Sequence, residues 1–184
     1  HAYPAADTAP ALWMLGSSDY GAQLAAHLGL PYAFAWFITD GQGADEALAI
    51  YRDSFRASAG LNLPHATVCV WALAADTDAE AWRLFESRAR WRMDRNLGRL
   101  GPLLPPEQAL REYSPAEQMA LERLRENALV GSAATVGSRL RRLAQSLELD
   151  ELVIITWTHD PAAQRRSYEL LAQEFSLAAQ GQAL

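Results

Sequence analysis

Four short apolar runs along the chain alternate with segments whose apolar residues recur at helical spacing. The runs cover residues 12–15, 32–38, 66–74 and 152–157, and each has the length of a β-strand. Helices are predicted over residues 19–28, 45–55, 77–96, 114–127, 136–147 and from 160 onward. Apolar strands that alternate with helices are typical of a parallel sheet with helices covering it, so the fold class is α/β.

The helix starts carry local signals that fix their positions. Thr77 is followed three residues later by Glu80, and Ser114 by Glu117, the spacing of a capping box. Asp160 stands directly before Pro161, which favours the first position of a helix. These signals predict that each of the three helices starts at the named polar residue.

Four β-α units do not close an eight-stranded barrel, which typically needs about 250 residues. The chain has 184 residues, so the pattern predicts either an open sheet or one half of a barrel. We treat residues 1–184 as a single region. A half-barrel has two outer strand edges that need a partner. The first residue is His1 rather than Met, which favours a piece of a longer polypeptide, with a processed start as the alternative.

Composition narrows the possible functions. The net charge is −6, and all 16 basic residues are arginine, which disfavours nucleic acid as a partner. No apolar run reaches the roughly 18 residues that a membrane span needs. The single cysteine, Cys69, cannot form an internal disulfide, so a cytoplasmic location is favoured. Metal-ligand spacings, nucleotide-binding glycine loops and hydrolase motifs are absent from the sequence.

Ligands of parallel α/β folds bind at the carboxyl ends of the strands, which directs attention to four loops. In the first, Gly16 allows close approach of the backbone, and Ser17 and Ser18 offer donors at the start of a helix. A helix N-terminus suits a phosphate group. The alternative interpretation is that Ser18 or Asp19 simply caps the helix.

Other candidates have plainer explanations. His159 and Asp160 could transfer a proton, but Asp160 at a helix start is more typical of a cap. An arginine-rich helix interleaved with aromatic residues could bind nucleic acid, yet an amphipathic helix with arginines facing water or lying over aromatic rings fits the net charge better. Its arginines are Arg83, Arg88, Arg90, Arg92, Arg95 and Arg99. Trp36 follows the second strand and could line a planar ring or pack the sheet end.

Several stretches together resemble the bacterial luciferase-like flavin monooxygenases. They are Leu12–Ser18, Ala22–Ala35, Ala74–Thr77, Gly131–Val136 and Arg166–Ala172, and they follow one another in the order of the family. The resemblance implies the C-terminal half of a (β/α)8, or TIM, barrel with extra helices before the last strand. It also implies that residues 97–130 form an insertion whose first part, 97–112, lies near a mobile lid.

By the same resemblance, Gly16, Ser17 and Ser18 fall on the loop that holds the flavin phosphate. Trp36 falls near the isoalloxazine ring, and Gly21 stands where luciferase has a threonine, so one donor is missing here. The resemblance assigns no catalytic residue to this half of the barrel, because the first-half strands carry the other catalytic groups. A metal ion is not expected.

The resemblance implies an enzyme that uses reduced FMN and oxygen on a small organic substrate, with the deazaflavin coenzyme F420 as the alternative cofactor. A flavin reductase is an expected partner, and the chain is expected to form a homo-oligomer or to pair with an N-terminal half-barrel. Two other readings stay open at this point. One is a non-catalytic flavin-binding or structural half-barrel that dimerises, and the other is a fragment without activity of its own.

Overall fold

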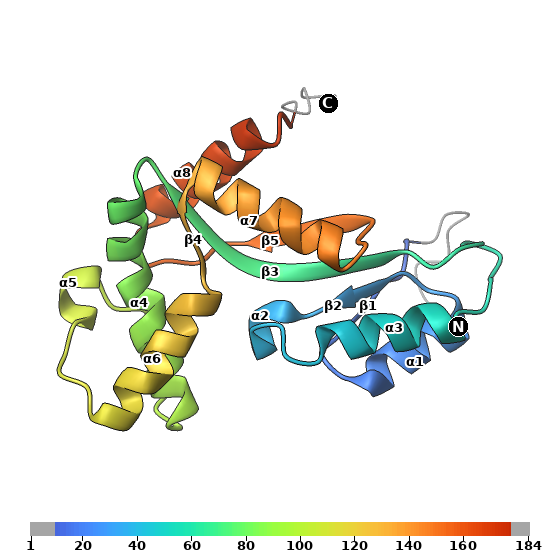
Figure 1. The fold of residues 1–184 in the computed structure, drawn as a ribbon, viewed down its shortest axis with the longest axis horizontal. Helices are drawn as coiled ribbons and strands as arrows, with labels where there is room; N and C mark the ends of the chain where they lie inside the picture. Colours follow the sequence, from blue (N-terminus) through green and yellow to red (C-terminus); the bar gives the residue numbers. More distant parts are fainter. Residues whose placement is uncertain (1–9, 178–184) are drawn as a thin grey trace, which may run out of the picture. The chain divides into compact units, whose positions relative to one another are not determined.

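The computed structural model describes residues 10–177, and its chain divides into two compact units. The first unit takes in the chain up to Cys69 together with Leu149–Leu152. The second takes in Val70–Glu148 and the chain from Val153 onward. β3 (Ala66–Ala75) and β5 (Glu151–Ile155), both labelled in Figure 1, contribute residues to both units.

The first unit is a small parallel sheet covered by helices. Its elements in chain order are β1 (Met14–Gly16), α1 (Asp19–Leu28), β2 (Tyr32–Phe34), α2 (Trp36–Thr39), α3 (Ala44–Ser54) and the start of β3. β2 lies between β1 and β3, and both pairings are parallel, with Gly16 opposite Phe34 and Phe34 opposite Val68. α1 packs against α3. All three strands therefore direct their carboxyl ends to one edge.

Two buried tyrosines join the layers of this unit. The Tyr32 and Tyr51 rings lie 5.4 Å apart, and both side chains are fully buried. The Tyr51 hydroxyl donates to the Leu30 carbonyl at 2.9 Å and accepts from the His65 N–H at 3.0 Å. The two bonds satisfy the buried hydroxyl and join it to the backbone just before β2 and just before β3.

The second unit surrounds the carboxyl half of β3. Its further elements are α4 (Asp78–Asn96), α5 (Pro106–Ala109), α6 (Pro115–Asn127), β4 (Leu129–Ser132), α7 (Ala133–Ser146), most of β5, and α8 (Pro161–Glu174). β4 pairs with β3 in parallel, with Ala72 opposite Leu129. β5 also pairs with β3, and just beyond it the Thr156 hydroxyl donates to the Ala72 carbonyl at 2.6 Å.

The predicted fold class is confirmed: the structure is a parallel α/β sheet with helices and is consistent with half of a TIM barrel. All ten residues of β3 are buried, as its continuous apolar run predicts for a strand covered on both faces. The capping signals are also confirmed. Thr77 accepts from the Glu80 N–H at 3.1 Å, and Ser114 and Glu117 cap each other.

One predicted strand is too long, and one strand was not predicted. The strand expected over residues 32–38 ends at Phe34, and Trp36–Thr39 forms one helical turn that stops at Asp40 in a left-handed conformation. The short strand β4 was missed, because Leu129 and Val130 make too short a run and Gly131, at φ 151°, resembles a loop residue in sequence. β4 depends on hydrogen bonds to the distant backbone of β3, whereas the α2 turn is closed locally by the Ile38 N–H, which donates to the Ala35 carbonyl at 3.1 Å.

Candidate functional site

The Gly16–Ser18 loop and Trp36 meet at one edge of the first unit. β1 ends at Gly16 and β2 ends at Phe34, and these two residues are opposite each other in the parallel ladder. The Gly16 carbonyl accepts a hydrogen bond from the Ala35 N–H at 2.8 Å. The segments that follow the two strands therefore begin side by side, at the edge where parallel α/β folds bind ligands.

Ser18 is the N-cap of α1, but its side chain makes no capping bond. Its backbone is extended, with φ −143° and ψ 161°, as in an ordinary cap. Side chains do cap four other helices of this chain: Thr77, Ser114, Ser132 and Asp160 each accept a first-turn N–H. The interpretation of Ser18 as a side-chain cap is therefore wrong. Its exposed hydroxyl and the first-turn N–H groups of a ten-residue helix remain available to a ligand.

Two neighbouring groups set the electrostatics of this loop. Asp19 lies in the first turn of α1, where it is exposed and opposes an anion at the same helix end. Tyr32 lies beneath the loop, where its hydroxyl donates a long bond of 3.4 Å to the Gly16 carbonyl. Burial, with a smaller contribution from the charge of Asp19, raises the pKa of Tyr32 to about 12. Tyr32 is therefore a neutral donor at physiological pH.

Trp36 is the first residue of α2 and is half-buried. Its indole ring packs on the backbone of Gly41, where φ is 90° and where a Cβ would overlap the ring. The adjoining Asp40 adopts φ 53°, which non-glycine residues rarely do. The glycine loop predicted after this strand thus has a packing role, since only glycine at position 41 lets the ring lie there.

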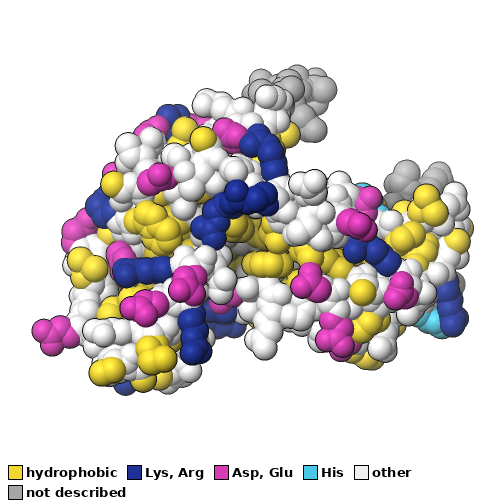
Figure 2. Space-filling model, in the orientation of Figure 1, with side chains coloured by type: hydrophobic (Ala, Val, Ile, Leu, Met, Phe, Trp, Pro, Cys, Tyr) yellow, Lys and Arg dark blue, Asp and Glu magenta, His cyan; other side chains and the backbone are white. Residues whose placement is uncertain are grey.

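The arginine-rich helix is partly as expected and partly different. The expectation is that its arginines face water or lie over aromatic rings, and Arg88, which is 3% exposed, meets it by lying over a ring, whereas Arg92 is 8% exposed and does not face water. The Arg88 guanidinium lies 4.1 Å from the Trp71 ring centre and 5.8 Å from that of Trp157. Burial of Arg88 could have been predicted, because it shares a helical stripe with the apolar Phe85 and Leu84. Basic and acidic side chains are interspersed on the face shown in Figure 2.

Asp160, the remaining histidines near the strands and Cys69 make no second candidate site. Asp160 caps α8 by accepting the Ala162 N–H at 2.8 Å, and His159 is exposed beside it. His65 contacts the Trp13 ring edge-on and lies 3.5 Å from Glu151. Burial raises the pKa of the Cys69 thiol. Across residues 10–177, no His, Cys, Asp and Glu side chains gather into a metal-binding group. No helix within the same span is both long and apolar enough to cross a membrane.

The structure is thus a parallel α/β sheet, consistent with half of a TIM barrel, in which α1 begins at the carboxyl edge of the sheet. The family model of the luciferase-like monooxygenases matches residues 1–150, so the chain belongs to that family. A luciferase-like monooxygenase of Escherichia coli K12 is 38% identical over 160 residues, which are 86% of this chain and 48% of that protein.

Solved structures agree with this assignment. The apo form of MsnO8 superimposes with a TM-score of 0.83 at 33% identity, over 96% of this chain and 54% of that one. The oxygenating constituent of 3,6-diketocamphane monooxygenase from Pseudomonas putida, solved with FMN, shares the fold with a TM-score of 0.62 at 22% identity. That match covers 90% of this chain and 48% of the other. The chain spans about half the length of the curated relatives it matches.

Proposed function

We propose that the chain supplies the phosphate-binding half of the flavin site in an FMN-dependent monooxygenase that acts with oxygen on a small organic substrate. The observation that carries the proposal is the exposed Ser18 hydroxyl, which makes no capping bond at the N-terminus of α1. Family membership and an FMN-bound structural neighbour support a flavin as the ligand. Position 21 is glycine, where luciferase has a threonine, so the side-chain donors of this loop are Ser17 and Ser18.

The residues present fit a phosphate group. A phosphate at Ser18 would receive the hydroxyl and the first-turn N–H groups, none of which is needed for capping by a side chain. Asp19 would point its charge toward solvent, consistent with its exposure. Trp36, fixed on Gly41, presents an aromatic surface at the end of the neighbouring strand, where a ring system attached to the phosphate would need a wall.

Bound reduced flavin supplies the oxygen chemistry of such an enzyme. This chain's own residues bind and orient: Ser17 and Ser18 hold the phosphate, and Trp36 limits the access of water to the ring. Tyr32 supports the loop from below as a neutral hydroxyl. None of these residues exchanges a proton with the substrate, so the other catalytic groups are expected from a first half-barrel.

The role of Ser18 is tested by replacing it with alanine, with a second serine-to-alanine substitution at another helix start as the control. Ser18→Ala is expected to weaken FMN binding about 10- to 100-fold, because a hydrogen bond to a charged group contributes about 1.5–3 kcal/mol. It should leave stability unchanged, since the hydroxyl makes no capping bond. Affinity is read from the quenching of FMN fluorescence, and stability from urea unfolding.

Ser114→Ala is the matched control. It removes a capping box on α6, so it is expected to cost about 1 kcal/mol of stability and to leave FMN affinity unchanged. Equal FMN affinity in wild type and Ser18→Ala would contradict the proposed phosphate site. The same titration with the deazaflavin coenzyme decides between the two cofactors.

A partner at the β1 edge is the second part of the proposal. Among residues 10–177, β1 pairs with β2 alone, and Leu12, Trp13 and Leu15 beside that edge are 65%, 43% and 55% exposed. An apolar open edge takes another strand. We propose that an N-terminal half-barrel covers it in the active enzyme, or a second copy of this chain where that half is lacking. A flavin reductase is the expected source of reduced FMN, in the cytoplasm.

A further inference from the structure

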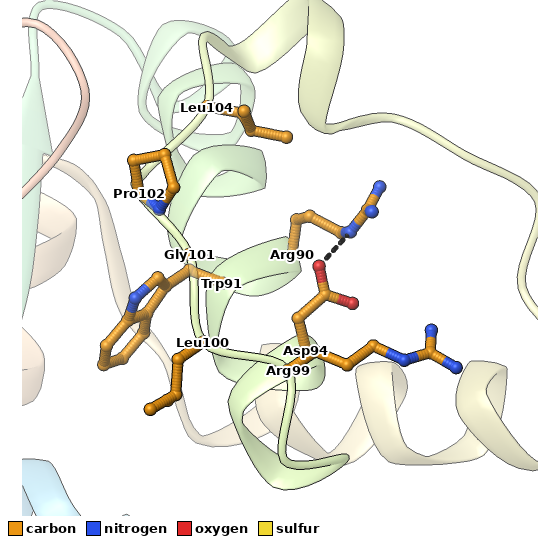
Figure 3. Close-up of a pocket in the computed structure, with 8 residues that line it drawn as sticks. All are labelled: Arg90, Trp91, Asp94, Arg99, Leu100, Gly101, Pro102 and Leu104. Carbon is orange, nitrogen blue, oxygen red and sulfur yellow. Dashed lines mark hydrogen bonds and ion pairs between the residues drawn. The ribbon is translucent and has the colours of Figure 1, made fainter.

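A small cavity in the second unit lies between α4 and the chain that follows it. Its volume is about 110 Å³. It is lined by Arg90, Trp91, Asp94, Arg99, Leu100, Gly101, Pro102 and Leu104. In Figure 3, Trp91, Leu100 and Pro102 lie on one side of the crossing chain, and Arg90 and Asp94 on the other. The cavity therefore has an apolar wall and a charged wall.

Arg90 provides the charged wall with a pre-oriented cation. Its Nε donates to the Asp94 carboxylate at 2.5 Å, one helical turn along α4, and its side chain is only 24% exposed. This bond engages Nε and leaves the Nη1 and Nη2 end of the guanidinium outside the ion pair. A guanidinium held through Nε presents two parallel N–H groups, a geometry that matches a carboxylate.

The charges around the cavity favour an anion. Arg111 bonds both oxygens of Glu117, at 2.6 and 3.2 Å, so that pair neutralises itself. Asp94 forms an ion pair with Arg90 and lies 3.9 Å from Arg111. The exposed Arg99 is therefore an additional positive charge on the lining of the cavity. One negative group on a ligand would balance this excess.

The apolar lining residues limit the size of the rest of the ligand, and Leu104 is the one that Figure 3 shows on the Arg90 side of the crossing chain. Trp91, Leu100, Pro102 and Leu104 supply apolar surface. An apolar cavity of about 150 Å³ accepts benzene, so the smaller space here fits a short hydrocarbon group. The ligand that matches both walls carries one carboxylate and about three or four carbons.

We propose that this cavity binds a small organic carboxylate, with its charge on Arg90 and its hydrocarbon on Trp91. The further step, that such carboxylates are the substrates of the enzyme, rests on the proposed monooxygenase function. The binding of a carboxylate in the cavity depends only on the residues of the second unit.

Residue-specific NMR on the full chain tests the site without flavin. The indole N–H signal of Trp91, assigned with Trp91→Phe, is followed during titration with butyrate and with its neutral isostere butyramide. Butyrate is expected to give a saturating shift, and butyramide to bind at least tenfold more weakly. Equal binding of the two, or no saturating shift with butyrate, would overturn the proposal.

Two variants and a control locate the ligand. Arg90→Gln is expected to weaken butyrate binding at least tenfold, because it removes the charged guanidinium and its two parallel N–H groups. Leu104→Trp fills the apolar side while it keeps the Arg90–Asp94 pair, and it should abolish the shift even if Arg90→Gln is poorly folded. Arg123→Gln, on the exposed face of α6, should leave the affinity unchanged. Retained butyrate binding in Leu104→Trp would refute the cavity as the site. The flavin proposal is decided separately, by the FMN affinity of wild type and Ser18→Ala.

Discussion

Glu117 shows how one side chain can anchor a segment. It accepts hydrogen bonds from the Arg111 guanidinium and from the N–H and hydroxyl of Ser114, the latter two at 2.9 and 3.0 Å. The Arg111 bonds first, and then those from Ser114, lower the pKa of Glu117 from 4.5 to about 2. The ionised carboxylate is therefore the form that the folded state favours.

The lowered pKa of Glu117 makes the stability of the fold depend on pH. Because the folded pKa lies below the unfolded one, the contribution of Glu117 is complete above about pH 4.5 and is lost as the pH falls toward 2. We expect Glu117→Gln to flatten the decline of unfolding free energy between pH 5 and 2, as measured by urea denaturation. Glu122→Gln, at an exposed position of the same helix, should keep the wild-type slope. Identical slopes in all three proteins would contradict this role.

At the scale of elements, the contact between α7 and α8 depends on one glycine. Gly137 is buried in α7, and a Cβ there would approach the Glu174 Cγ of α8 to 2.5 Å. Gly137→Val is therefore expected to cost about 1–3 kcal/mol of stability in urea unfolding, because the Glu174 side chain must move from its place beside α7, where it pairs with Arg141. Gly60→Val is the control, since no atom lies within 4 Å of its added Cβ. A similar cost for both substitutions would show that packing at Gly137 is not the cause.

Element boundaries were predictable where the signal is local. Asp19–Leu28 is the helix that the sequence predicts, and Thr77 and Ser114 cap the helices that follow them. Prediction failed at β4, because a four-residue strand exists only through its pairing with β3, and at α2, because a single helical turn is too short to show a helical spacing of apolar residues. At the site, the serines could be located from the sequence, but the unused hydroxyl of Ser18 could not, since capping depends on side-chain geometry.

At the scale of the whole molecule, the open edge of β1 is the feature to test. If a second copy covers this edge, the chain alone should be dimeric by light scattering, and Leu15→Lys should shift it toward monomer. A charge on an edge strand disfavours pairing with another strand. Leu63→Lys, at a loop residue that is 75% exposed, is expected to leave the dimer intact. A monomeric wild-type chain would contradict self-pairing and leave an N-terminal half-barrel as the proposed partner.

The central claim is that the Gly16–Ser18 loop holds the phosphate of FMN. Its most direct test is to follow the backbone amide signals of Gly16, Ser17 and Ser18 by NMR while FMN, and separately riboflavin, is added to the protein. The account predicts saturating shifts at these amides with FMN and at least tenfold weaker binding of riboflavin, which lacks the phosphate. Unchanged signals at these three residues, or equal responses to FMN and riboflavin, would contradict it.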